Sequence, residues 1–363
     1  MLNEAYTKRL AEVAQRVETR AKQGPVVLVF GLGSFGDVTQ ITSLLRAMRT
    51  RFPKAQVVLL HNDLLGASLV KHSPFIDEYI RLRGTLQAFF RASLRPDAWD
   101  LIVECRYVIK YTLAPKSRLS PEEIAFVESA QAVQKAWLPF VQNFPFDNDR
   151  LWRAAKDHGW SMYDLMANTA GLPEEDFEAL QIDPPTEKPS LEAFGLPSRY
   201  AVVSNAAEWL MLQSSLWTKC LPHARMREVL LELKKRKVPT VLLGTSNDPG
   251  DYPVDIDLRG RSNLLEAAEI VRQARLVLGP EGGLVNLAKA VSVPSVVFFG
   301  STPVEFFGFK ANRNLAPRFC GGCWWTTESY LRHCPLLEPI PPCTNSIDAP
   351  TIVAAVEELF HRS

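Results

Sequence analysis

The sequence lacks the features expected of a membrane protein, an exported protein or a nucleic-acid-binding protein. No apolar run approaches the roughly 20 residues that a membrane-spanning helix needs. The N-terminus carries charges where a signal peptide would need an apolar region, so we expect a cytoplasmic protein. Lys and Arg number 41 against 40 Asp and Glu, so no overall field draws in nucleic acid or a membrane surface.

What remains is the composition of an ordinary globular protein. The chain has 363 residues, of which 47% are hydrophobic and 22% charged. This length exceeds what one hydrophobic core usually serves and suits two domains. Apolar strand-like runs alternate with helical stretches in both halves, which predicts βαβ units and parallel sheets.

The expected elements fall on either side of a proline-rich stretch. Predicted strands cover residues 26–30, 56–60, 78–82, 100–104, 200–204, 238–244, 257–259, 274–278 and 295–299. Predicted helices cover residues 3–22, 38–51, 64–71, 86–93, 121–134, 151–157, 161–170, 223–237, 264–273, 284–291 and 351–360. Five prolines between residues 172 and 199 indicate a linker. We therefore predict an N-terminal helix (1–24), a first domain (25–175), a linker (176–198) and a second domain (199–363), with a cleft between two doubly wound sheets.

The first strand runs into a glycine turn that carries an acid. Gly31, Gly33 and Gly36 precede Asp37, which stands at the start of a helix. Asp37 is explained equally well as a helix N-cap or as a catalytic carboxylate at the ligand-binding edge of the sheet. The glycines also fit a dinucleotide fingerprint, but that site needs an acid ending the second strand, and here Asn62 stands between that strand and Asp63.

A second glycine turn, Gly279-Pro-Glu-Gly-Gly283, lies between a strand and a helix in the second half. Its glycines let the backbone approach a ligand closely, and the free N–H groups of the helix start suit a diphosphate. The alternative is a turn that only packs the helix against the sheet. Lys219 is a further candidate, because an ammonium can neutralise a phosphate, although a solvated surface lysine is an equally good interpretation.

Together with Gly36-Asp37 and Phe299-Gly-Ser-Thr302, this turn resembles glycosyltransferase family 9, the heptosyltransferase family. The resemblance covers residues 26–52 and 258–302 and implies the GT-B architecture, two Rossmann-like domains facing across a cleft. The family segment Asp-Ser/Thr-Gly-x-x-His binds the nucleotide-sugar donor. Here Glu281 replaces the Asp, Gly282 the hydroxyl residue and Asn286 the His, whereas Gly283 is retained.

The resemblance implies an inverting transferase that moves a sugar, heptose, from a nucleotide-diphosphate donor such as ADP-heptose to a saccharide or protein acceptor, as in lipopolysaccharide biosynthesis. Asp37 is then the catalytic base, and no cofactor is needed for catalysis. Expected donor-binding residues are Asn205, Lys219, Gly244, Thr245, Glu281, Gly282, Gly283, Leu284, Asn286 and Thr302. Expected acceptor-binding residues are Gly36, Arg106 and Lys110, within a basic stretch that continues to Lys116 and Arg118.

Four of the six cysteines cluster near the C-terminus, namely Cys320, Cys323, Cys334 and Cys343. Because cytosolic cysteines are reduced, this cluster predicts a structural zinc or iron site, with free or redox thiols as the alternative. A similar cluster holds iron in the family subgroup that modifies bacterial autotransporters. Two other functions remain open: an NAD(P)-dependent oxidoreductase using Gly31, Gly33 and Gly36, and a non-catalytic nucleotide-sugar-binding relative.

Overall fold

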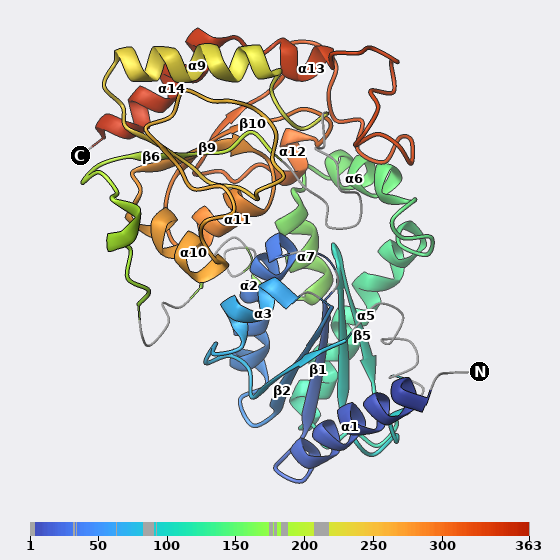
Figure 1. The fold of residues 1–363 in the computed structure, drawn as a ribbon. Coiled ribbons are helices and arrows are strands. Elements are labelled where there is room, and N and C mark those ends of the chain that lie inside the picture. Colours follow the sequence, from blue (N-terminus) through green and yellow to red (C-terminus); the bar gives the residue numbers. More distant parts are fainter. Residues whose placement is uncertain are drawn as a thin grey trace. The chain divides into compact units, whose positions relative to one another are not determined.

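The computed structural model describes residues 4–31, 33, 35–62, 64–82, 91, 93–173, 177, 180–182, 188–206 and 218–362. The chain forms two compact units (Figure 1). Unit 1 comprises Met1–Gln142 and Tyr163–Leu180, and unit 2 comprises Asn143–Met162 and Gln181–Ser363. The linker and the exact domain boundaries expected from the sequence stay a prediction.

Unit 1 is built on a five-stranded sheet in the order β3-β2-β1-β4-β5. Its elements are α1 (Glu4–Ala21), β1 (Val26–Gly31), α2 (Phe35–Arg51), β2 (Gln56–His61), α3 (Leu64–Val70), β3 (Glu78–Arg81), β4 (Leu101–Arg106), β5 (Val108–Leu113), α5 (Pro121–Trp137), η1 (Leu138–Phe140) and α7 (Met162–Ala170). The first four strands in that order pair in parallel, whereas β5 is antiparallel to β4.

The central strand of unit 1 explains why helices cover both faces of the sheet. All six residues of β1 are buried, and successive side chains of a strand point to opposite faces. Val26, Leu28 and Phe30 share one core with Leu10 and Val17 of α1. The helix α2 packs against β1 and β2. Because β1, β2 and β4 are parallel, their carboxyl ends, Gly31, His61 and Arg106, lie at one edge of the sheet.

Unit 2 holds a six-stranded, wholly parallel sheet in the order β11-β10-β9-β6-β7-β8. Its elements are α6 (Asn148–Asp157), η2 (Glu192–Phe194), β6 (Ala201–Val203), α9 (His223–Lys235), β7 (Thr240–Leu242), β8 (Ile256–Asp257), α10 (Leu264–Gln273), β9 (Leu276–Pro280), α11 (Gly283–Ala290), β10 (Ser295–Phe298), α12 (Val304–Phe307), β11 (Arg313–Leu315), α13 (Pro342–Asn345) and α14 (Ala349–His361). The helices α9 and α14 pack on one face, and α10 and α11 lie on the other (Figure 1).

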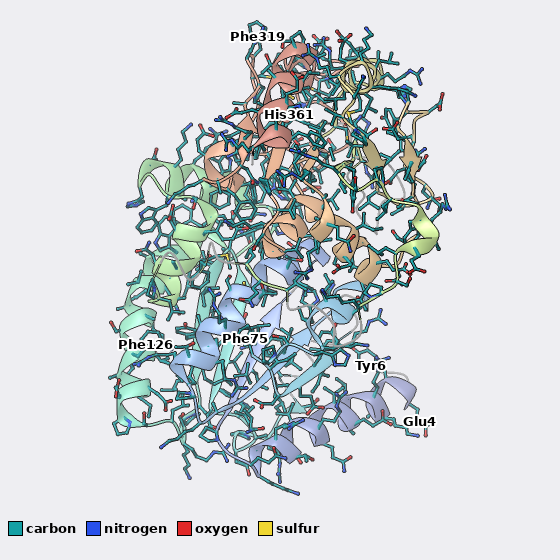
Figure 2. All side chains as sticks on the ribbon, turned by 90° about the vertical axis from the view of Figure 1, so that its left-hand side faces the viewer. Glu4, Tyr6, Phe75, Phe126, Phe319 and His361 are labelled. Atoms are coloured by element: carbon teal, nitrogen blue, oxygen red, sulfur yellow. The ribbon has the colours of Figure 1, made fainter. Side chains whose placement is uncertain are left out.

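The predicted fold class, two doubly wound α/β units, is confirmed by these two sheets. The sequence did not predict β5, which follows β4 after the single residue Tyr107. Tyr107 adopts a left-handed conformation (φ 65°) without being a glycine, so no turn signature marks the reversal. In Figure 2, Phe126 marks the helix α5 that covers β5: its ring lies 6.3 Å from Tyr111 and 6.1 Å from Phe52.

Other predictions differ in extent or fall outside the described residues. The strand β11 and the short helices α12 and α13 were not expected, because each is only three or four residues long. Most of the helix expected at 86–93 lies outside the described residues. Among the helices that the structure describes, none combines the length and apolar composition that crossing a bilayer requires.

We predict that His61 makes the stability of the protein depend on pH. Burial lowers the pKa of this histidine from 6.5 to about 4. In the unfolded chain His61 is protonated below about pH 6.5, whereas in the folded chain it stays neutral until about pH 4. Between these pH values the unfolded state binds one more proton than the folded state. The free energy of unfolding should fall by about 3 kcal/mol as the pH drops through that window, at roughly 1.4 kcal/mol per pKa unit.

The measurement is urea denaturation between pH 7 and pH 4 with two variants. His61→Leu should flatten the dependence on pH in this window. His72→Leu is the matched control, because His72 is exposed, and it should keep the wild-type dependence. Equal dependence on pH in all three proteins would contradict the assignment.

Candidate functional site

The glycine turn of unit 2 connects the end of β9 to the start of α11. Gly282 precedes the helix with φ 156°, a backbone conformation that side chains rarely allow, and therefore requires glycine. Gly282 also has no side chain with which to cap α11. The first N–H groups of a helix lack partners within the helix, so this end of α11 offers donors and a positive dipole end to an anion.

An ion pair stands at this turn. Lys219 Nζ lies 2.6 Å from Glu281 Oε2, and both side chains are nearly buried, with 13% and 11% of their surface exposed. The same ammonium lies 3.9 Å from the place where a Cβ on Gly282 would stand. The structure therefore brings together Lys219, Glu281 and Gly282, three residues that the sequence named separately as candidates for the donor site. It also shows that Lys219 is not a solvated surface lysine.

The remaining predicted donor residues of this edge differ in their surroundings. Leu284 is half-buried, and Asn286 is buried in α11 with its backbone N–H donating to the Gly282 carbonyl oxygen at 3.1 Å. Thr302 follows β10 and is only 4% exposed. Its hydroxyl has no hydrogen-bond partner among the described residues, which makes it a buried donor that a ligand can satisfy.

Asn205, at the end of β6, holds the backbone next to Lys219. Its Nδ2 donates to the Leu221 carbonyl oxygen at 3.0 Å, and its Oδ1 accepts from the Leu221 N–H at 2.9 Å. Nδ2 also lies 3.0 Å from the Tyr252 hydroxyl. The predicted donor-binding residue Asn205 thus fixes the chain that carries Lys219, a structural part that the sequence did not reveal.

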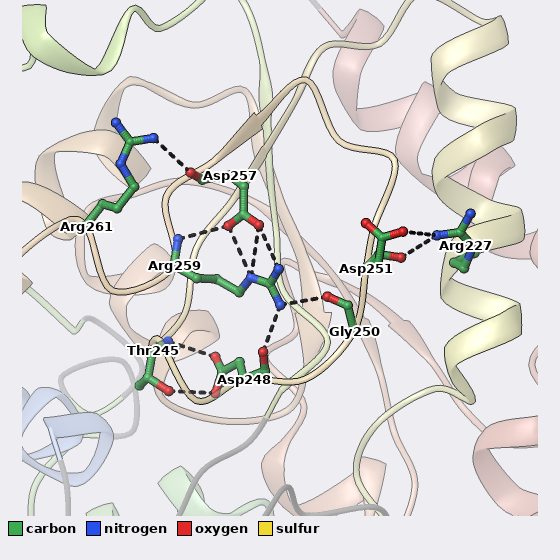
Figure 3. A network of polar contacts seen from close by, with 8 residues as sticks. All are labelled: Arg227, Thr245, Asp248, Gly250, Asp251, Asp257, Arg259 and Arg261. Atoms are coloured by element: carbon green, nitrogen blue, oxygen red, sulfur yellow. Dashed lines mark hydrogen bonds and ion pairs between the residues drawn. The ribbon is translucent and has the colours of Figure 1, made fainter.

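Gly244 and Thr245, the residues expected near the nucleoside, follow β7, and Thr245 belongs to a polar network (Figure 3). Thr245 donates to Asp248 twice, from its backbone N–H to Oδ2 and from its hydroxyl to Oδ1, each at 2.8 Å. Arg259 donates to the carbonyl oxygens of Asp248 and Gly250 at 2.8 and 2.9 Å. Its guanidinium also pairs with Asp257 at 2.7 Å, and this hydrogen-bonded arginine lowers the pKa of the Asp257 carboxyl. The network fixes the loop that carries both predicted residues.

In unit 1 the glycine turn is held between two polar side chains. Gly33 donates its N–H to Asn62 Oδ1 at 3.0 Å. A Cβ on Gly33 would stand 2.2 Å from Asp37 Oδ2, so the absence of a side chain lets the carboxylate lie over the turn. The N–H that a dinucleotide phosphate would need is thus taken by Asn62. This arrangement weakens the oxidoreductase alternative and keeps Asp37 beside the carboxyl edge of the sheet.

The basic residues Arg106, Lys110 and Arg118 lie at two opposite ends of strand β4. Arg106 ends β4 and Lys110 lies in β5, where its Nζ is 3.7 Å from Glu104, a carboxylate that also pairs with Arg91 at 2.7 Å. Arg118 instead pairs with the buried Asp100, 2.6 Å away, at the other end of β4. Because β5 runs antiparallel to β4, only Arg106 and Lys110 stay near the edge that carries Gly36 and Asp37.

The four clustered cysteines lie close enough for a charge on one thiol to affect the pKa of another. Burial, with the neighbouring thiols as a lesser cause, raises the pKa of Cys323 to about 11 and that of Cys343 to about 12. Their donor chemistry suits a soft metal ion. Yet within the described ranges no three His, Cys, Asp or Glu side chains are arranged to hold an ion. The arrangement of the thiols in this structure thus does not fit a metal site.

Comparison with known proteins decides the family. Residues 143–318, nearly half of the chain, match the family model "Glycosyltransferase family 9 (heptosyltransferase)". This region is a glycosyltransferase family 9 domain. The predicted family and the predicted class of enzyme, a glycosyltransferase, are confirmed by this match. No curated protein matches the sequence.

Solved structures match nearly the whole chain at low identity. The family 9 glycosyltransferase from Veillonella parvula has a TM-score of 0.60 at 14% identity, covering 93% of this chain and 98% of its own. E. coli ADP-heptose lps heptosyltransferase II gives 0.58 at 16% identity, with coverage of 92% and 98%. TibC, an iron-containing dodecameric glycosyltransferase from enterotoxigenic E. coli, gives 0.57 at 15%, with 94% and 79%. These likenesses show the GT-B fold.

We predict that the Lys219–Glu281 pair contributes measurably to stability. Glu281→Gln keeps the size of the side chain but leaves a nearly buried ammonium without its counter-charge. The free energy of unfolding should therefore fall by about 2 kcal/mol. Glu305→Gln is the matched control, because Glu305 pairs with Lys156 at 3.0 Å while more than half exposed.

Urea denaturation of both variants at pH 7 is the measurement. The control should lose less than about 0.5 kcal/mol, since exposed pairs are screened by solvent. Equal losses in the two variants would show that burial of the Lys219 pair adds nothing.

Proposed function

We propose that this protein is an inverting glycosyltransferase that transfers a sugar, heptose, from ADP-heptose to a saccharide or protein acceptor. The observation that carries the proposal is the Lys219–Glu281 pair beside Gly282 and the uncapped start of α11. A fixed ammonium and a row of backbone donors at one turn suit the two phosphates of a nucleotide-diphosphate sugar. The match to family 9 supports the reaction class, and a TibC structure in complex with ADP-D-beta-D-heptose supports the donor.

The proposed reaction is a single displacement at the anomeric carbon. Asp37 takes the proton from the acceptor hydroxyl while that oxygen forms the new bond to the anomeric carbon. The bond from the same carbon to the diphosphate oxygen breaks, and the nucleoside diphosphate leaves with the electron pair. Lys219 and the N–H groups at the start of α11 stabilise the charge that develops on the leaving diphosphate. Attack opposite to the leaving group inverts the configuration.

The other predicted residues take supporting parts in this proposal. Glu281 holds Lys219, and Thr302, Asn286 and Leu284 line the same edge as the donor turn. Gly244 and Thr245 lie on the loop proposed to meet the nucleoside. Gly36, Arg106 and Lys110 are proposed to contact the acceptor, whose phosphate groups would suit the two cations. We also propose that the reaction takes place in the cytoplasm and, by likeness to the lps heptosyltransferase, belongs to lipopolysaccharide biosynthesis.

A structural zinc or iron on Cys320, Cys323, Cys334 and Cys343 is a separate part of the proposal. Four thiols within electrostatic reach, and the likeness to the iron-containing TibC, support it. The positions of the thiols in this structure do not support a metal site, so binding of an ion requires the thiols to move into a tetrahedral arrangement. Metal analysis of protein purified without chelators tests it, and about one ion per chain is expected.

We predict that Asp37→Asn abolishes most of the turnover. The amide keeps the shape and much of the hydrogen bonding of the carboxylate but cannot accept the proton. The rate of transfer from ADP-heptose should therefore fall by about two to four orders of magnitude, with little change in melting temperature. Glu122→Gln, the same loss of charge in the first turn of α5, is the control and should keep the wild-type rate.

Two outcomes would count against parts of this proposal. Turnover of Asp37→Asn within tenfold of the wild type would leave Asp37 as an acid in the first turn of α2 without a part in the reaction. Wild-type protein that binds ADP-heptose but neither transfers nor hydrolyses it would favour the non-catalytic relative.

A further inference from the structure

Lys219 is held from both sides by hydrogen bonds to its chain neighbours. On one side Asn205 binds both backbone groups of Leu221. On the other side the Thr218 carbonyl oxygen accepts from the Ser301 N–H at 3.1 Å. Such anchoring reduces the conformational freedom that Lys219 would lose on meeting a phosphate, which is the usual benefit of preorganisation.

The Thr218 side chain adds a second anchor, from a distant part of the chain. Its hydroxyl lies 3.1 Å from Ser301 Oγ and 3.3 Å from the Leu331 carbonyl oxygen. Because a carbonyl only accepts and a hydroxyl has one hydrogen, Thr218 donates to Leu331 and accepts from Ser301. Thr218 is 1% exposed and Ser301 is fully buried, so the bond between their hydroxyls is shielded from water, and the bond to Leu331 is part-buried. Leu331 belongs to the cysteine segment, which we define as residues 320–343.

The cysteine segment also packs closely on the chain that follows β10. Gly322 donates its N–H to the Gly300 carbonyl oxygen at 3.1 Å. A Cβ on Gly300 would stand 2.2 Å from the Thr218 carbonyl oxygen and 2.6 Å from Thr344 Cγ2, so only glycine permits this approach. The segment therefore contacts the chain after β10 through a backbone hydrogen bond at Gly300, the residue that also lies tightly against the Thr218 carbonyl oxygen.

A third observation places this segment near the ion pair. Tyr330, buried in the segment, packs 5.3 Å from the Trp325 ring. Burial and the nearby Glu281 carboxylate raise the pKa of its phenol. The outer part of the segment is exposed, with 89% of Leu337 accessible. The segment thus has one buried side at the donor turn and one side in solvent.

We propose that Thr218 is a positioning residue through which the cysteine segment holds Lys219 at the donor diphosphate. The inference rests on the proposed function, because it presumes a diphosphate at this turn. It assigns the cysteine segment a part in donor binding, through the hydrogen bond from Thr218 to Leu331. Order in the segment and affinity for the diphosphate are then coupled, and each must affect the other equally.

Thr218→Val tests the positioning part, with ADP and adenosine as ligands in calorimetry. The variant keeps the branched shape but loses both hydroxyl contacts. We expect the Kd for ADP to rise about five- to tenfold, the usual effect of losing one buried hydrogen bond, while the Kd for adenosine is unchanged. Thr218→Ser should restore the wild-type values. Thr240→Val is the matched control, a buried threonine whose hydroxyl binds Asp255 before β8, and it should leave both constants unchanged.

A double-mutant cycle shows whether Thr218 acts through Lys219. In a Lys219→Met background, Thr218→Val should cause no further loss of ADP affinity, whereas independent effects would add. An unchanged Kd for ADP in Thr218→Val, equal weakening of ADP and adenosine, or additivity in the cycle would each overturn the inference and leave the proposed function standing. Failure of wild-type protein to bind ADP would overturn both. Should Thr218→Val not fold, Thr218→Ala removes the same two hydroxyl contacts, and an unchanged ADP affinity there overturns the inference as well.

Limited proteolysis tests whether order in the cysteine segment is coupled to binding of the diphosphate. Saturating ADP should slow cleavage within residues 320–343 in wild-type protein and have no such effect in Lys219→Met. Cleavage that ADP leaves unchanged in the wild type would overturn the coupling.

Discussion

The Lys219–Glu281 ion pair is the interaction on which the glycine turn of unit 2 depends. It joins two segments far apart in the sequence at the turn where β9 gives way to α11. A nearly buried pair carries a large desolvation cost, which is offset only when both charges are well placed. The surrounding contacts provide that placement: Asn205 fixes the backbone after Lys219, and the ammonium lies beside the turn at Gly282. A bound diphosphate would add anionic charge beside a cation whose position is already set.

The glycine turn of unit 1, which follows strand β1, has different polar neighbours. There Gly33 is bound by Asn62 on one side and lies under the Asp37 carboxylate on the other. Negative charge rather than positive charge thus stands beside this glycine turn, and its N–H is already used. That arrangement is poorly suited to a phosphate and well suited to a base. The two glycine turns resemble each other in sequence, yet one lies beside the ammonium of Lys219 and the other beside the carboxylate of Asp37.

The sequence predicted the longer helices, most of the strands and both glycine turns, because apolar periodicity and glycine positions are local signals. It also named Lys219 and Glu281, although only the fold shows that they meet. It did not predict β5, whose turn contains Tyr107 instead of a glycine, and so it wrongly grouped Arg118 with Arg106. The hydrogen bonds of Thr218 could not be foreseen either, since they depend on tertiary packing between segments about 80 and 110 residues away. The sequence showed that four cysteines cluster near the C-terminus, but not how their thiols are arranged in space.

Calorimetry of the purified protein with ADP, UDP and NADH tests the central claim most directly, that the turn of Lys219, Glu281 and Gly282 binds the diphosphate of a nucleotide sugar. We expect that ADP binds at one site per chain, and that Lys219→Met weakens this binding by about tenfold or more, the effect of losing one charged contact to phosphate. Binding of NADH without ADP or UDP, or ADP binding that is unaffected by Lys219→Met, would contradict it.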